Sequence, residues 1–408
     1  MEIKSEALRL HEDNRGKIEI CSKVKLENAD DLSLAYTPGV AEPCREIQRD
    51  PSLVNNYTNK GNTVAVISDG TAVLGLGDIG PEAALPVMEG KAILFKTFAK
   101  IDAIPICLGT KNTDEIIETV IRLAPTFGGI NLEDISAPRC FKIEEEIISR
   151  VGIPVFHDDQ HGTGVVCLAG LLNALRVVDK KIDQVKIVIN GAGSAGQAIA
   201  RLLWTAGARQ IKLCDLKGIL SPDQEGINSY QKALAQLTNP EKVKGDLSSA
   251  LKGADVFIGV SAANILSSEM VKQMAPQPVL FAMANPEPEI SPEEAKRGGA
   301  AIIGTGRSDY PNQVNNILGF PGIFRGALDV QAKRISKGMM LAAAYAIASL
   351  ISQEELATDY VIPSPFDPRV VPAVAYAVGS KAIEEGLAKL SITKEDLKKN
   401  LIKKFGNW

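Results

Sequence analysis

The sequence predicts an α/β protein in which two consecutive α/β domains precede a helical C-terminal tail, the second domain being a doubly wound parallel sheet of the Rossmann type. Two observations support this fold class. From residue 60 onward, short apolar runs alternate with longer helical patterns, which is typical of strand–helix–strand units. A long helical pattern over 163–178 interrupts that alternation, which then restarts. We therefore expect domains over 1–160 and 161–385 and a tail over 386–408.

Four apolar runs predict the strands of the first domain, with helical patterns such as 113–124 and 140–151 between them. The four runs cover 63–68, 103–108, 128–132 and 153–156.

The apolar runs of the second domain are continuous rather than alternating, which is typical of strands buried on both faces of a parallel sheet. They cover 185–190, 210–215, 254–260, 278–285 and 300–306. After about residue 330 the pattern is helical, and the chain ends in a basic amphipathic helix over 393–408.

The composition is that of a globular protein, because 45% of the 408 residues are hydrophobic and 23% are charged. A net charge of −4 argues against nucleic acid and acidic membranes as partners. The apolar stretch over 339–351 is too short to span a bilayer, and the charged N-terminus does not look like a signal peptide. The six cysteines show no CxxC spacing, which indicates free thiols in a reducing compartment. We expect a cytoplasmic protein.

A glycine motif, "GAGSAG" over 191–196, follows a buried strand and opens a helix rich in small residues. In this context Gly191 permits a tight turn, Gly193 lets backbone N–H groups approach a pyrophosphate, and Gly196 lets the helix pack on the strand. Asp215 ends the next strand, where it can accept hydrogen bonds from a ribose. The motif therefore predicts a dinucleotide site; the alternative is a tight turn that binds nothing.

A second match, "GLGDIG" over 75–80, lacks that context. Pro81 and Pro86 follow it, and no acidic residue closes a second strand at the right distance. Its glycines are expected to form a loop near a substrate.

Two pairs of acids follow predicted strands: Glu133 with Asp134, and Asp158 with Asp159. Ligands gather at the carboxyl ends of parallel strands, and converging carboxylates would repel each other unless a cation joined them. Oxygen ligands suit Mg²⁺ or Mn²⁺. Either pair alone could instead cap a helix, but together they favour a metal site. His157 and His161 raise zinc as a rival, which the scarcity of nearby cysteines disfavours.

Two further residues have a structural and a functional interpretation. Lys91 lies in a largely apolar helical pattern, where a lysine usually extends to the surface; buried near a metal, it would have a lowered pKa and could act as a base. Tyr36 precedes Pro-Gly on a turn, where tyrosine is more often a packing residue than an acid.

Together these segments resemble the malic enzyme family, specifically its short prokaryotic type. The resemblance runs from about residue 10 to 380. The matching motifs, in chain order, are "AYTPGV", "SDGTAVLGLGDIGPEAALPVMEGKAILFK", "INLEDISAPRCF", "VFHDDQHGTG", "AMANPEPEI" and "NNILGFPGIFRGAL". It implies an N-terminal malic domain, a C-terminal NAD(P)-binding domain, a divalent metal, and a homodimer or higher oligomer whose active site borrows residues across the interface.

The resemblance also implies a role for individual residues. Lys91 corresponds to the general base and contacts the substrate, and Tyr36 corresponds to the general acid. The remaining assignments are Glu133, Asp134 and Asp159 as metal ligands, Asp158 as an orienting residue, Ala192, Gly193, Ser194 and Ala195 along the dinucleotide phosphates, and Asn285 with Asn315 or Asn316 at the substrate or nicotinamide. Ala72 departs from the animal enzymes, whose arginine at this position grips a substrate carboxylate.

The implied reaction is the oxidative decarboxylation of L-malate to pyruvate and CO₂ with reduction of NAD or NADP. Lys91 would take the C2 hydroxyl proton while C2 gives hydride to nicotinamide, the metal would polarise the ketone, and Tyr36 would protonate C3 after CO₂ leaves. The alternatives are a malolactic conversion of malate to lactate with bound NAD, a catalytically silent NAD-binding module and, more distantly, a zinc hydrolase.

NAD is the expected cofactor, with NADP as the alternative. The Asp215 carboxylate can accept from both ribose hydroxyls and would repel a 2′-phosphate, although Lys217 could offset that charge. The resemblance also implies that family members that prefer NADP carry a lysine downstream of this strand. This chain has neutral Gln231 at that position, and Lys232 is displaced by one residue.

Overall fold

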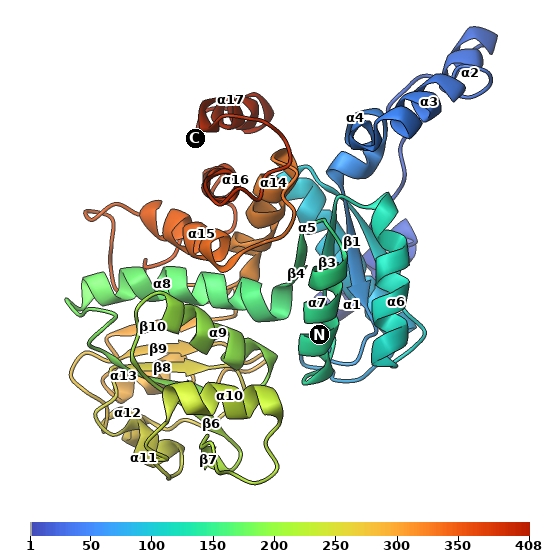
Figure 1. Ribbon diagram of the computed structural model, residues 1–408. Helices are drawn as coiled ribbons and strands as arrows, with labels where there is room; N and C mark the ends of the chain where they lie inside the picture. Colours follow the sequence, from blue (N-terminus) through green and yellow to red (C-terminus); the bar gives the residue numbers. More distant parts are fainter. Residues whose placement is uncertain (1) are drawn as a thin grey trace.

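The computed structural model describes residues 2–408, which fold around two separate sheets (Figure 1). The helices are α1 (Glu2–Asn14), α2 (Ala29–Ala35), α3 (Ala41–Arg49), α4 (Val54–Tyr57), α5 (Pro81–Ala99), α6 (Thr113–Leu123), α7 (Arg139–Arg150), α8 (Thr163–Val177), α9 (Ser194–Thr205), α10 (Ser229–Thr238), α11 (Leu247–Leu251), α12 (Ser268–Val271), α13 (Pro292–Arg297), α14 (Phe320–Asp329), α15 (Lys337–Ser349), α16 (Val370–Glu384) and α17 (Lys394–Phe405). None of them is long and apolar enough to cross a membrane.

The first sheet has four parallel strands in the order β2-β1-β3-β4. They are β1 (Thr63–Ser68), β2 (Asp102–Cys107), β3 (Gly129–Leu132) and β4 (Val155–His157). Because side chains alternate along a strand, Val64 and Val66 of β1 pack with α5, whereas Ala65 and Ile67 pack with α6 and α7. Burial of both faces explains why β1 is an unbroken apolar run.

The second sheet has the order β10-β9-β8-β5-β6-β7, with β7 antiparallel to β6 and the other strands parallel. Its strands are β5 (Lys186–Asn190), β6 (Gln210–Asp215), β7 (Gly218–Ile219), β8 (Val256–Gly259), β9 (Val279–Ala282) and β10 (Ile302–Thr305). Ile187 and Ile189 of β5 pack in the core that includes α8 and α9, whereas Val188 packs in the core with α11 to α13. The predicted doubly wound Rossmann-type sheet is therefore confirmed.

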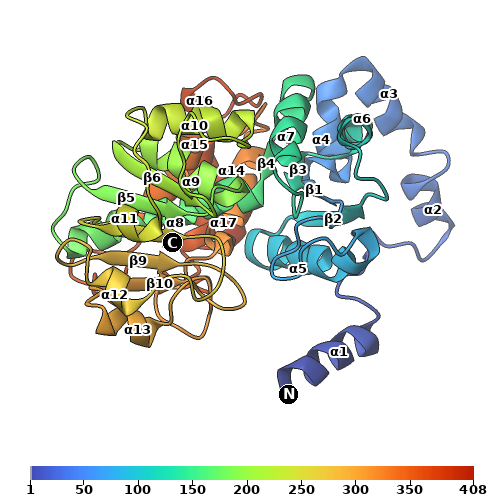
Figure 2. The same ribbon diagram turned by 90° about the horizontal axis from the view of Figure 1, so that it is seen from below.

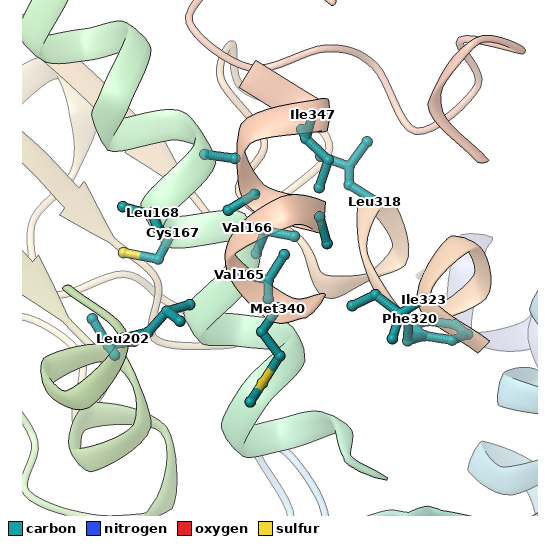
Figure 3. Packing of buried hydrophobic residues seen from close by; sticks show 14 of the residues in the cluster. Val165, Val166, Cys167, Leu168, Leu202, Leu318, Phe320, Ile323, Met340 and Ile347 are labelled. Carbon is teal, nitrogen blue, oxygen red and sulfur yellow. The ribbon is translucent and has the colours of Figure 1, made fainter. Parts of the chain in front are cut away.

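Helices from the C-terminal part of the chain join the two sheets. Figure 3 shows Leu202 of α9 on one side of α8 and Met340 and Ile347 of α15 on the other. On the side of the first sheet, the ring of Phe95 in α5 lies 4.7 Å from that of Phe320 and 5.3 Å from that of Phe324, both in α14. α14 lies within the predicted second domain, yet it packs against α5 of the first, which its apolar pattern alone could not predict.

The N-terminal segment that includes α2 and α3 forms an arm that projects from the body (Figures 1 and 2). Neither helix contains a buried residue. Apolar side chains on the arm are instead open, with Ile20 95% and Leu34 78% exposed. An apolar surface of this kind is normally covered by another protein surface.

Candidate active site

Three acidic residues converge where β3 and β4 end. Glu133, Asp134 and Asp159 each offer a carboxylate oxygen, and these oxygens lie within 4.8 Å of one another. We name them the acid cluster. The backbone helps to bring them together, because the N–H of Asp134 donates to Oδ2 of Asp159 at 2.7 Å and Asp134 adopts a left-handed φ of 54°. Three hard oxygen donors at one point are the ligands that Mg²⁺ and Mn²⁺ prefer.

The charges of this cluster are poorly compensated. Burial, together with the neighbouring carboxylates, raises the pKa of Glu133 to about 7, that of Asp134 to about 9 and that of Asp159 to about 6. Each of these pKa values would fall if positive charge were added among the oxygens. The donor set and its electrostatics therefore fit a divalent cation.

Lys91 and Asp158 form a buried ion pair beside the acid cluster. Nζ of Lys91 donates to Oδ2 of Asp158 at 2.6 Å, lies 2.9 Å from Oε1 of Glu133 and sits 4.3 Å from the ring centre of Phe320. Burial alone would lower the pKa of Lys91, but the charges of Asp158 and Glu133 outweigh it and raise that pKa above its ordinary value. A lowered pKa was expected for a Lys91 buried near a metal, and these carboxylate contacts alone do not test that expectation.

Asp158 itself is completely buried, and burial raises its pKa to about 7. Its Oδ2 also accepts a hydrogen bond from Nδ2 of Asn316, while no partner for Oδ1 is found among the side chains of residues 4–408. A Cβ added to Gly162 would come within 1.8 Å of that Oδ1, so a glycine is required one turn later. These contacts agree with the expectation that Asp158 orients the site, but they do not test it.

Glu144 of α7 anchors the segment that carries both aspartates. Its carboxylate accepts from the backbone N–H of His157 and contacts Nε2 of His161, each at 2.9 Å. These contacts hold a single π-helical turn over Asp158–Gly162, after which α8 begins. In the described residues neither histidine belongs to the group of acids that could hold a metal, so the geometry gives the zinc alternative no support.

A second brace comes from Arg139, the first residue of α7. Its guanidinium donates to Asp69, Thr71, Ser136 and the carbonyl of Lys111, which joins the loops that follow β1, β2 and β3. In the same region the N–H of Ala72 donates to the carbonyl of Asp134 at 3.0 Å. Ala72, which stands where the animal enzymes have an arginine, therefore adjoins the acid cluster.

The glycine loop of the second domain has the shape that a dinucleotide site requires. Gly191 has φ +114°, and a Cβ there would lie 2.6 Å from the carbonyl of Val260. A Cβ at Gly196 would lie 1.8 Å from the carbonyl of Gly191, so only glycine allows α9 to approach. Gly193 precedes α9 and is open, which leaves backbone N–H groups accessible to phosphate.

The other residues predicted at this loop lie where the motif requires. Ser194 and Ala195 open α9, and the carbonyl of Ala192 accepts from Gln197 and Gln231. Asp215 ends β6, and its carboxylate accepts from the N–H of Lys217 at 2.7 Å and from Nε2 of Gln224.

The three predicted asparagines are placed differently. Asn316 reaches Asp158, as described above, whereas Asn315 uses its side-chain oxygen to accept from the N–H of Ile317. Asn285 lies against the "GLGDIG" loop, since a Cβ at Gly75 would be 3.6 Å from its carbonyl oxygen. That loop thus meets the second domain, in agreement with its expected position near a substrate.

Tyr36 is not brought to the site within one chain. It caps the C-terminal end of α2, a helix of the projecting arm (Figure 1), and its side chain is 67% exposed, whereas Lys91 of α5 is buried. Any role in the same reaction therefore needs the arm of another copy.

Three residues that position the site were not predicted: Glu144, Arg139 and Glu289. Buried Glu289 accepts from the N–H groups of Ser261 and Ala284, and so links the loops after β8 and β9. The burial periodicity of α7 could have indicated Glu144, but nothing in the pattern "NPEPEI" separates Glu289 from Glu287.

Fold and site define a class of protein: an oxidoreductase with a Rossmann-type dinucleotide domain and an acidic divalent-metal site. Comparison with known proteins identifies the family. Residues 15–148 match the malic enzyme N-terminal domain and residues 160–383 match the malic enzyme NAD-binding domain. The chain belongs to the malic enzyme family.

Individual relatives agree. A protein of Bacillus subtilis (strain 168), named bifunctional malic/malolactic enzyme, is 58% identical over 398 residues, covering 97% of each chain. A Geobacillus stearothermophilus NAD-dependent malic enzyme is 58% identical over 92% of this chain and 78% of its own. The crystal structure of a Pyrococcus horikoshii malic enzyme superposes with a TM-score of 0.94 at 49% identity, covering 98% of this chain and 95% of that one. The predicted family and its activity, the NAD(P)-dependent oxidative decarboxylation of malate, are confirmed.

Proposed function

We propose that Lys91, the acid cluster and a tyrosine from a second copy carry out this reaction on L-malate, with NAD as the favoured cofactor. The observation that carries the proposal is the contact of Lys91 with Asp158 and Glu133 directly beside the acid cluster. This contact supports a proton acceptor and a cation site close enough together to act on one hydroxyl group.

A divalent cation held by Glu133, Asp134 and Asp159 would stabilise negative charge on the C2 oxygen of malate and, by adding positive charge, lower the pKa of Lys91. Mg²⁺ and Mn²⁺ both suit the oxygen ligands. Lys91 then takes the C2 hydroxyl proton, and Asp158 with Asn316 keeps the amine in place. The buried aromatic ring of Phe320 beside Nζ helps to exclude water.

The dinucleotide is bound by the loop over 191–196, with Asp215 at the ribose. Ala72 itself offers no charge to a substrate carboxylate, so this role would fall to a cation in the acid cluster and to the amide groups of Asn285 and Asn316. The side chain of Asn315 already caps a turn, which makes it the weaker of the two neighbouring candidates.

The arm supplies the final proton. Its exposed apolar side chains would be buried in a homodimer, and Tyr36 would thereby enter the site of the partner and protonate C3 after CO₂ leaves. A dimeric cytoplasmic enzyme is consistent with these features and with the free cysteines.

A malolactic conversion is the second candidate, because the Bacillus subtilis relative carries that activity in its name. In that case the nucleotide would stay bound and return hydride to pyruvate, and lactate would leave instead.

The test of the metal site is Asp159→Asn. Loss of one charged ligand should abolish malate oxidation and weaken Mn²⁺ binding, measured by calorimetry on the same preparation. Asp114→Asn, an exposed acid at the start of α6, is the matched control. Near-normal turnover and Mn²⁺ affinity in Asp159→Asn would refute the assignment.

A further inference from the structure

A cavity of about 590 Å³ lies at the end of the first sheet opposite the acid cluster. Its walls come from distant parts of the chain: the segment over 51–60, the connections that lead into β3 and β4, and C-terminal residues near 331 and 389–391. In Figure 1, α4 and the connection between α16 and α17 lie at this same end of the molecule. The reaction described above uses none of these residues.

The lining of this cavity is cationic. Lys60, Arg150 and Lys389 contribute to it, and none of the described residues that line it is acidic. Arg150 is already paired with Glu118 outside the cavity. Among the side chains of residues 4–408, no carboxylate lies within ion-pair distance of Lys60 or Lys389, so two positive charges remain without compensation.

Main-chain carbonyl groups hold both ammonium groups in place. Nζ of Lys60 donates to the carbonyls of Ala124 and Pro125, at 3.0 and 2.6 Å, and Nζ of Lys389 donates to the carbonyl of Gly152. An ammonium has three donors, so Lys60 keeps one and Lys389 keeps two for another acceptor. The carbonyl groups fix the positions of the charges without neutralising them.

The pKa values of both ammonium groups are lowered. Burial, and then the charge of Lys389, lowers the pKa of Lys60; burial, and then the charge of Lys333, lowers the pKa of Lys389. Neutral polar groups complete the cavity, and Nδ2 of Asn55 donates to Oε1 of Gln331 across it at 3.0 Å. Fixed cations and amide groups without an acid are the features of a site for an anion.

We propose that this cavity binds a small doubly charged anion, a phosphate group or a dicarboxylate, shared between Lys60 and Lys389. Such a ligand would join the first α/β domain, which carries Lys60, to the C-terminal segment, which carries Lys389. Binding would therefore stabilise the folded chain and limit movement of α16 and α17 relative to the first sheet.

The test uses the full chain with inorganic phosphate and, separately, succinate, against chloride at equal ionic strength. Binding is measured by calorimetry and by the shift in melting temperature. Lys389→Gln keeps a donor for the carbonyl of Gly152 but removes the charge, and Lys60→Gln does the same for the other cation. Lys403→Gln, on the exposed face of α17, is the matched control for loss of one charge.

We expect saturable binding of at least one anion, weakened about tenfold or more by either cavity variant and unchanged in Lys403→Gln. Whichever probe binds identifies the ligand as phosphate-like or dicarboxylate. Binding of phosphate or succinate that is equally strong in the wild type and in all variants would overturn the proposal, because the anion would then be bound in the active site rather than in this cavity. Absence of saturable binding by both anions would also overturn it. A molecular mass that decreases as anion is added would overturn it too. That result would mean that the anion displaces part of a second copy, which normally occupies the cavity.

Discussion

Mixing a Lys91→Ala chain with a Tyr36→Phe chain is expected to restore activity that neither variant has alone. Each variant should lose roughly 10²–10⁴-fold in turnover, because each lacks one positioned proton-transfer group. The structure predicts complementation because Lys91 is buried beside the acid cluster, whereas Tyr36 is exposed on an arm that projects from the same chain.

The extent of recovery follows from the symmetry of a dimer. In a mixed dimer, one site combines the Lys91 of the Tyr36→Phe chain with the Tyr36 of the other chain and is intact; the second site lacks both groups. Random assortment makes about half of the dimers mixed, and half of the sites in those are intact, so the mixture should reach about a quarter of wild-type activity. Isolated mixed dimers should reach about half.

The assay is malate-dependent NADH formation after co-expression of the two chains with different affinity tags. Purification through both tags isolates the mixed dimer. Recovery is absent if Tyr36 acts on its own chain or has no part in the reaction, so inactive mixed dimers of normal mass would refute the reasoning. Nearly wild-type turnover of Tyr36→Phe alone would refute it as well.

Other expectations concern stability, metal binding and the cofactor. Glu144→Ala should lower the free energy of unfolding by roughly 3–5 kcal/mol in a urea titration, because it leaves His161 and a backbone N–H unpaired in the interior; exposed Glu146→Ala should change it little. The pKa of Glu133 is raised to about 7, so its protonation stabilises the metal-free protein. This contribution is fully present below the ordinary glutamate pKa and is lost as the pH rises through about 7. Mn²⁺ should therefore raise the melting temperature more at about pH 8 than at about pH 5.5, and an equal shift would contradict the ligand assignment. Gln231→Lys should raise kcat/KM with NADP relative to NAD at saturating malate, while removing the hydrogen bond of Gln231 to the N–H of Asn228; a wild-type preference for NADP would overturn it.

The parts of the fold that follow a local pattern could be predicted from the sequence. Strands such as 63–68 are apolar because both faces are covered, and any strand buried on both faces needs an apolar sequence. The loop over 191–196 was predictable because two of its glycines leave no room for a Cβ. Acid pairs that follow two strands were expected to meet because parallel strands end at one edge.

Other features depend on contacts between distant segments. Glu144 is one of three consecutive glutamates, and only the packing of α7 on the sheet decides which of them is buried. The raised pKa of Lys91 reflects two carboxylates whose distance from Nζ is set by tertiary structure, whereas its sequence context indicated only burial. The exposure of Tyr36 likewise depends on the direction of the arm, which no local pattern encodes.

The most direct measurement supplies the protein with L-malate, Mn²⁺ and NAD and quantifies NADH, pyruvate and lactate in the same reaction. Oxidative decarboxylation by this site predicts that pyruvate and free NADH appear in equal amounts and that both disappear in the Asp159→Asn variant. Lactate without free NADH would contradict the account in favour of a malolactic reaction, and the absence of all three products would contradict the assigned site.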